Sequence, residues 1–145
     1  RYYLNQALKV SGLGDQFLDN LQIWRDQMAL GLTTWAEMPE PSRSDCHAWG
    51  ASPNIEFYRI LLGIDSDAPG FRKIRIAPSL GKLKEVSGTI SHPLGSVTAA
   101  YKLDERGEGT ARLVLPEGTT GIFIWDGKEI PLKPGEQVIS LSSRH

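Results

Sequence analysis

The spacing of apolar residues changes once along the chain, and this change restricts the possible folds more than any other feature. Up to about residue 63, apolar side chains recur every three or four positions, as at Leu21 and Trp24, which is the period of a helix. From Phe71 onward they alternate with polar or small residues, which is the period of a strand. Helices followed by strands, without regular alternation, predict an α+β chain in two parts.

Three helices are predicted in the first part. The first covers residues 1–10, and the second runs from a capping Asp15 to a stop at Gly31. The third covers roughly residues 45–62. Pro53 lies within it, so either the regular helix begins there, with Ser52 as its cap, or it kinks there.

The second part predicts seven or eight short strands separated by turn residues. Asp126-Gly127 lies between two apolar runs and is a strong signal for a two-residue hairpin turn. Strands at this spacing are typical of an antiparallel sandwich. We therefore predict a helical domain over residues 1–66 and a β-sandwich domain over residues 71–145.

Composition excludes several kinds of partner and cofactor. The formal net charge is -1, whereas nucleic-acid binding needs a basic surplus. No apolar run approaches the ~20 residues of a membrane span. The single cysteine cannot build a cysteine-based zinc site, and the neighbouring Asp45, Cys46 and His47 are poorly spaced to converge on one metal. We expect no metal, no cofactor, no nucleic acid and no membrane.

The richest chemistry lies between residues 33 and 64. Trp35 and Glu37 fall on a loop after the second helix, and His47 precedes the third. An aromatic ring can stack on a sugar face, and an ionised carboxylate can deprotonate a water molecule. Each residue also has a simpler interpretation: Glu37 as a solvated surface charge, and His47 as a structural histidine.

Other polar groups in this region support fewer possibilities. Arg43 and Arg59 either orient carboxylates such as Glu37 or are surface cations. Ser42, Asp45 and His47 are too close in sequence to imply a hydrolase triad.

In the β part, Tyr101, Phe123 and Trp125 could form a sugar-binding platform, but their alternation with other apolar residues favours packing within the sandwich.

Several stretches resemble bacterial α-L-rhamnosidases. Residues 31–37 (GLTTWAE), 44–50 (SDCHAWG) and 57–64 (FYRILLGI) are similar to the end of the catalytic domain of that family. Residues 69–78 (PGFRKIRIAP) resemble the junction into its C-terminal β-sandwich. The resemblance is strongest over residues 33–78 and looser after Leu103.

The resemblance implies the last helices of an (α/α)6 barrel followed by a jelly-roll-like antiparallel β-sandwich. It also implies removal of terminal α-L-rhamnose with inversion, for which one carboxylic acid protonates the leaving oxygen and a carboxylate activates water. Glu37 would be that general base, His47 a sugar contact, and Trp35 would flank the base. The implied partners are a rhamnose-containing glycan or glycoside and the rest of the same polypeptide.

Two departures from the family pattern matter. The general acid of the family lies far upstream of these motifs, and the loop between Glu37 and His47 is short. The chain also begins at Arg1 inside a helical pattern. We therefore expect a C-terminal piece of a larger enzyme that is inactive alone, because a base without its acid and a positioned sugar lacks both proton transfer and orientation.

Two alternatives stay open. One is another (α/α)6 glycosidase, fucosidase-like or trehalase-like. The other is a non-catalytic module whose β-sandwich binds carbohydrate or braces the helical part.

Overall fold

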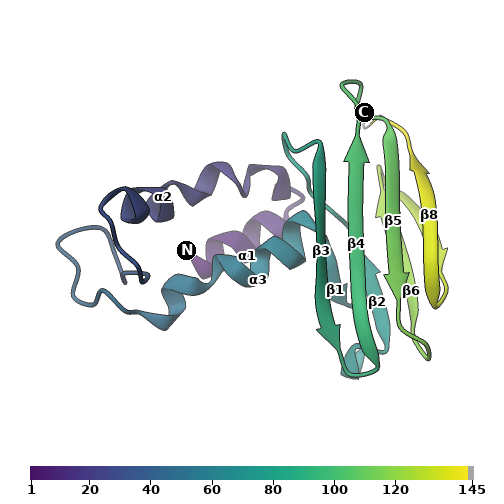
Figure 1. Cartoon of the computed structure of the whole chain (residues 1–145), viewed down its shortest axis with the longest axis horizontal. Coiled ribbons are helices and arrows are strands. Elements are labelled where there is room, and N and C mark those ends of the chain that lie inside the picture. Colours follow the sequence, from purple (N-terminus) through teal and green to yellow (C-terminus); the bar gives the residue numbers. More distant parts are fainter. Residues whose placement is uncertain (144–145) are drawn as a thin grey trace. The chain divides into compact units, whose positions relative to one another are not determined.

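The computed structural model describes residues 1–143, which form two compact units. The first unit is Arg1–Phe57, and the second begins at Tyr58. The domain boundary between residues 66 and 71, expected from the sequence, stays a prediction. Figure 1 shows a helical unit and a unit of strands, in the order that the change of apolar spacing predicts.

The helical unit contains three α-helices and several shorter helical turns. The α-helices are α1 (Tyr2–Val10), α2 (Gln22–Ala29) and α3 (Pro53–Glu56), and the 3-10 turns are Gly14–Gln16, Asp19–Leu21 and Ala48–Ala51. The first predicted helix is confirmed. The second is only partly right, because two 3-10 turns precede α2, and Asp15 lies in the first of them instead of capping an α-helix.

The end of α2 follows from one glycine. Gly31 has a φ of 79°, and the N–H groups of Gly31 and Leu32 bond back to the carbonyls of Met28 and Gln27 at 3.0 and 3.1 Å. This is the Schellman pattern, in which a left-handed residue lets the chain satisfy the last helical carbonyls. The predicted stop at Gly31 is confirmed.

The third helical segment changes type along its length. Residues 45–47 are irregular, Ala48–Ala51 is a 3-10 turn, and α3 begins with Pro53 at its first position. Proline suits that position because its missing N–H would have no helical partner. The helix continues as a π-helical turn, Phe57–Leu61, and Ser52 makes no side-chain capping bond. The segment is therefore an α-helix that starts at Pro53.

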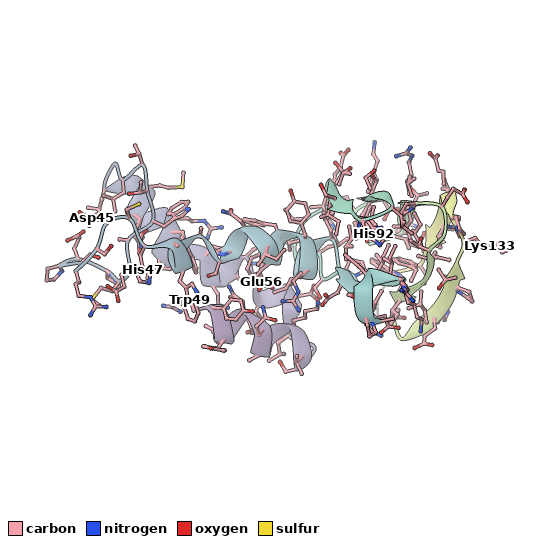
Figure 2. The ribbon with its side chains drawn as sticks, turned by 90° about the horizontal axis from the view of Figure 1, so that it is seen from below. Asp45, His47, Trp49, Glu56, His92 and Lys133 are labelled. Atoms are coloured by element: carbon pink, nitrogen blue, oxygen red, sulfur yellow. The ribbon has the colours of Figure 1, made fainter. Side chains whose placement is uncertain are left out.

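Side chains from α1, α2, α3 and the segment of two 3-10 turns before α2 fill the interior of the first unit. Phe17, Leu21 and Trp24 are buried, and the rings of Phe17 and Phe57 meet edge to face at 5.5 Å. The interior also contains polar residues: Asn5, Gln27 and Glu56 are all buried, and Gln6 donates a hydrogen bond to Glu56, which Figure 2 labels on α3. Met28, at the end of the predicted apolar stripe, is exposed instead.

The second unit contains two four-stranded sheets around one hydrophobic core. One sheet has the order β1-β2-β6-β7 and the other β3-β4-β5-β8. The strands are β1 (Ile64–Ser66), β2 (Lys73–Ile76), β3 (Glu85–His92), β4 (Gly95–Leu103), β5 (Gly109–Leu115), β6 (Thr120–Trp125), β7 (Lys128–Leu132) and β8 (Gly135–Leu141). Ile74 and Phe123 from one sheet and Val97 and Leu113 from the other belong to the same buried cluster, so the two sheets form a sandwich.

One strand pair corrects the sequence-based prediction of a jelly-roll-like antiparallel sandwich. β2 and β6 run parallel, with Ile76 opposite Phe123, while all other neighbouring strands are antiparallel. Between β2 and β6 the chain builds three strands of the other sheet, which is a connection long enough for a parallel pair. Apolar alternation cannot reveal this direction, because it is the same for both kinds of pairing.

The predicted hairpin is confirmed. Asp126 and Gly127, with φ values of 49° and 71°, join β6 to β7, and Trp125 pairs with Lys128. Positive φ at both central residues defines the type I′ turn, which glycine adopts without strain.

Candidate active site

The loop after α2 folds back so that its two arms lie side by side. The N–H of Glu37 donates to the carbonyl of Ser44 at 2.9 Å, and the N–H of His47 donates to the carbonyl of Trp35 at 2.8 Å. The Thr34 hydroxyl adds a bond to the carbonyl of Asp45. Glu37 and His47, ten residues apart in sequence, are therefore held on facing arms of one loop.

Two side chains of α2 anchor this loop from below. The Trp24 indole N–H donates to the carbonyl of Gly50 at 2.6 Å. The Gln27 carboxamide accepts a bond from the N–H of Ala36 at 3.0 Å and approaches its carbonyl at 3.5 Å. Trp24 and Gln27 are three residues apart and therefore lie on the same helix face, so Ala36 and Gly50 are bound to one helix.

Glu37 and His47 line the same cavity, which has a volume of about 130 Å³. Its lining comes from α1, α2, the loop and the 3-10 turn after it: Arg1, Tyr2, Ile23, Trp24, Gln27, Ala36, Glu37, His47, Trp49 and Gly50. A cavity that combines apolar rings with a carboxylate, an imidazole and an arginine has the composition of a small polar-ligand site.

The Glu37 carboxylate is bound at both oxygens by one guanidinium. Arg43 Nε donates to Oε2 at 2.8 Å, and Arg43 Nη2 donates to Oε1. These hydrogen bonds, followed by the charges of Arg43 and His47, hold the pKa of the Glu37 carboxyl below its ordinary value, although partial desolvation acts in the opposite direction. Glu37 is therefore ionised at neutral pH, as a proton acceptor must be.

The imidazole of His47 is available to a ligand. Its backbone N–H donates to the carbonyl of Trp35, whereas its ring makes no hydrogen bond within residues 1–143. Figure 2 labels His47 and Trp49 close together where the loop enters the third helical segment. A ring nitrogen at this place can bond to a ligand hydroxyl in the cavity.

The two tryptophans of the region lie in different places. Trp49 lines the cavity of Glu37, is 63 % exposed, and meets the ring of Tyr2 at 5.8 Å. Trp35 instead lines a second, more apolar hollow of about 280 Å³, together with Met28 and Phe57. The sequence predicts that Trp35 flanks Glu37, and of these two tryptophans it is Trp49 that lines the cavity of Glu37.

The remaining predicted groups fall outside this cavity. Arg43 does orient Glu37, but Arg59 pairs with Asp65, at 3.1 Å between Nη2 and Oδ2. Tyr101, Phe123 and Trp125 are buried in the sandwich core, so the predicted packing role is confirmed and they form no exposed sugar platform.

Among residues 1–143, no three His, Cys, Asp or Glu side chains gather where they could hold a metal ion. In the same part of the chain, no helix has the length and apolar character to cross a membrane.

The fold and the site together define a helical unit followed by a two-sheet sandwich, with a carboxylate cavity in the helical unit. Residues 63–137 match the family described as bacterial α-L-rhamnosidase C-terminal domain, and the chain belongs to that family. No curated protein sequence matches the chain.

Solved structures of α-L-rhamnosidases have a similar fold. The enzyme of Aspergillus terreus is similar over 97 % of this chain with a TM-score of 0.80 and 20 % identity. The enzyme of Streptomyces avermitilis, solved with L-rhamnose, is similar over 83 % with a TM-score of 0.60 and 20 % identity. The enzyme of Dictyoglumus thermophilum is similar over 67 % with a TM-score of 0.58 and 24 % identity. The chain spans 18, 14 and 12 % of the lengths of these three proteins, respectively.

Proposed function

We propose that this chain supplies the general base for inverting hydrolysis of terminal α-L-rhamnosides. The observation that carries the proposal is that Glu37 lines one cavity with His47 and Trp49, and Arg43 holds the pKa of its carboxyl below the ordinary value. Membership of the rhamnosidase C-terminal family gives the substrate class.

The proposed chemistry follows from these groups. Glu37 takes a proton from a water molecule as that water attacks the anomeric carbon on the face opposite the leaving oxygen. His47 bonds a sugar hydroxyl, and an aromatic ring covers an apolar face of the sugar. Trp35 is the aromatic residue predicted from the sequence, and Trp49 is the one that the cavity favours.

The partner carboxylic acid belongs to polypeptide outside these 145 residues in this proposal. An inverting pair needs carboxyl groups about 6.5–9.5 Å apart, so that a water molecule fits between the base and the sugar. We propose that the helical unit is the end of an (α/α)6 barrel whose other helices bring that acid. The solved rhamnosidases, each more than five times longer than this chain, support a site shared with further polypeptide.

The second unit has a scaffolding role in this proposal. Tyr101, Phe123 and Trp125 are buried between its sheets, and Tyr58 and Phe71 pack partly buried against the same core, which favours a structural role over a carbohydrate-binding one. Binding of rhamnose-containing glycans to residues 58–145, measured by calorimetry, would instead favour the carbohydrate-binding alternative.

The test replaces Glu37 in the active enzyme that contains this sequence. We expect Glu37→Gln to lower kcat on p-nitrophenyl α-L-rhamnoside by roughly 10²- to 10⁴-fold, because the attacking water loses its proton acceptor. Glu40→Gln is the matched control, since Glu40 lies on the same loop but, among residues 1–143, its side chain accepts a hydrogen bond from the N–H of Ser42 alone. Near-normal turnover by the folded Glu37→Gln variant would refute the assignment.

A nucleophile that needs no deprotonation separates a base from a structural residue. With Glu37→Ala, azide should restore turnover and form the β-L-rhamnosyl azide, because azide attacks the face from which water was activated. Loss of activity without azide rescue, in a correctly folded variant, would indicate that Glu37 has a structural role only.

A further inference from the structure

The ion pair between Glu37 and Arg43 is asymmetric in its surroundings. The Glu37 side chain is 16 % exposed and lines the cavity, whereas the Arg43 side chain is 77 % exposed and is absent from the described cavity lining. The guanidinium therefore binds the carboxylate from outside the cavity. A carboxylate has about four lone-pair positions, so a two-pronged bond to arginine leaves others for a water molecule inside the cavity.

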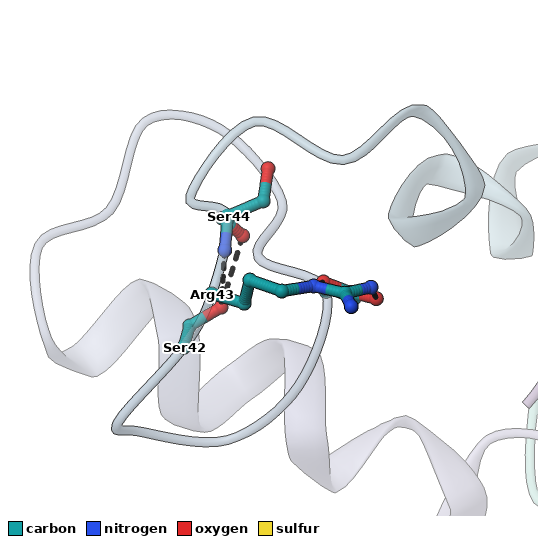
Figure 3. A network of polar contacts seen from close by, with 4 residues as sticks. Ser42, Arg43 and Ser44 are labelled. Atoms are coloured by element: carbon teal, nitrogen blue, oxygen red, sulfur yellow. Dashed lines mark hydrogen bonds and ion pairs between the residues drawn. The ribbon is translucent and has the colours of Figure 1, made fainter.

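The loop is built so that Arg43 returns to Glu37. The Ser42 hydroxyl donates to the carbonyl of Ser44 at 2.9 Å and accepts from its N–H at 3.3 Å, which ties together the two neighbours of Arg43, as Figure 3 shows. The backbone bond from Glu37 to Ser44 then fixes this turn against the residue that Arg43 binds. The pair thus depends on a local hydrogen-bonded turn as well as on opposite charge.

We propose that Arg43 is a positioning residue for the general base: from outside the cavity it fixes the plane of the Glu37 carboxylate and keeps it ionised. This inference rests on the proposed function of Glu37. It adds a second residue, Arg43, which affects the reaction through Glu37 and makes no contact with the substrate.

The chemical reason lies in the division of work between two carboxyl groups. An inverting glycosidase needs one carboxyl group protonated and the other ionised at the same pH. Arg43 is the first cause of the lowered pKa of Glu37, and the charge of His47, across the loop, acts in the same direction. Arg1, directly before α1, also lines the cavity, but it is not among the causes of this lowered pKa. Glu37 therefore stays ionised at acidic pH values where a partner acid is protonated.

Because Arg43 lowers the pKa of Glu37, removing Arg43 should shift the dependence of kcat/KM on pH in one defined direction. Without Arg43, the pKa of Glu37 rises toward its ordinary value, so the base becomes protonated at a higher pH. The acidic limb of the profile of kcat/KM against pH should then move to higher pH. The stabilisation that Glu37 gains from the pair is present above the unfolded-state pKa and is lost as the pH falls through the lower folded-state pKa.

Kinetics of Arg43 variants in the active enzyme form the first arm of the test. In Arg43→Gln we expect the acidic limb to move upward and kcat/KM at acidic pH to fall roughly 10- to 100-fold, because the carboxylate is also less well oriented. KM should change little, since Arg43 does not line the cavity. Arg43→Lys should restore the position of the limb in part, because lysine keeps the charge but not the two-pronged geometry.

A charge-matched control and a direct titration complete the test. Arg106→Gln removes the same charge from the turn between β4 and β5 and should leave the profile unchanged. Carbon-detected NMR of the active enzyme, labelled at the glutamate carboxyl carbons, should show the Glu37 carboxyl titrating at higher pH in Arg43→Gln than in the wild type. An unchanged titration and an unchanged acidic limb in that folded variant would overturn the proposal.

The two arms separate this inference from the proposed function. In one outcome, Glu37→Gln remains active while Arg43→Gln still raises the pH at which the Glu37 carboxyl titrates. The ion pair is then confirmed, but the assignment of Glu37 as the base is wrong, and the positioning role of Arg43 is overturned with it. If Glu37→Gln is inactive and Arg43→Gln has the wild-type profile, only the role of Arg43 is overturned.

Discussion

The Gln27 side chain makes a hydrogen-bonded pair with the backbone of Ala36, the residue directly before Glu37. Its amide oxygen accepts the Ala36 N–H at 3.0 Å, and its amide nitrogen faces the Ala36 carbonyl at 3.5 Å. Gln27 and Ala36 are both buried. A glutamine in the interior thus replaces a neighbouring strand, because the loop has no such strand to satisfy its backbone at this point.

This relationship predicts the effect of Gln27→Met. Methionine has a similar length but cannot accept the Ala36 N–H, so a buried donor is left unpaired at a cost of about 1–3 kcal/mol. In the active enzyme we expect the loop to shift and kcat to fall by at least about tenfold, since small displacements of a catalytic group are costly. Thermal unfolding and steady-state kinetics measure the two effects.

The control for this variant is Gln22→Met on the same helix. Gln22 is exposed, and its side chain bonds to Asp26 one turn later and to no other residue in the described part of the chain, so we expect a change within about 0.5 kcal/mol and normal kcat. Equal behaviour of the two variants would show that the contact with Ala36 has no particular importance.

The features that sequence reasoning predicted correctly depend on neighbours in sequence. The helix stop at Gly31 and the turn at Asp126-Gly127 each need a positive φ at a defined position, and a single residue type supplies it. The burial of Tyr101 and Phe123 follows from alternation along one strand. Such signals are complete within a few residues.

The features that it missed depend on contacts between distant segments. Asp15 has a side chain suited to a helix cap, but two 3-10 turns, and no α-helix, place Phe17 and Leu21 in the interior. The parallel direction of β2 and β6 depends on the path of the chain through the other sheet. The cavity lined by Trp49 also depends on α1, because the ring of Tyr2 contacts the ring of Trp49 although the two residues are 47 positions apart in sequence. No local pattern contains this information.

The contrast between the two tryptophans gives a functional prediction. Trp49→Ala should raise KM for an α-L-rhamnoside by about five- to tenfold, because Trp49 shares the cavity of Glu37 and has an exposed face for stacking. Trp35→Ala should affect stability more than KM, because Trp35 lines the separate apolar hollow. Initial-rate kinetics and thermal melts of both variants check this division. The reverse result would return the sugar-contact assignment to Trp35.

In the second unit, the hydroxyl of Tyr101 on β4 donates a hydrogen bond of 2.8 Å to the carbonyl of Leu62, which lies between the π-helical turn and β1. Both residues are buried, and Leu62 belongs to the sandwich core. Tyr101→Phe keeps the ring packing against Phe123 but removes the donor to a buried carbonyl. We expect a loss of about 1–2 kcal/mol in the free energy of unfolding, measured by urea denaturation. Tyr3→Phe is the matched control, because Tyr3 is 71 % exposed and its hydroxyl is hydrated in both states. A Tyr101→Phe variant as stable as Tyr3→Phe would show that solvent or another donor replaces the bond, and that Leu62 is held in place by packing alone.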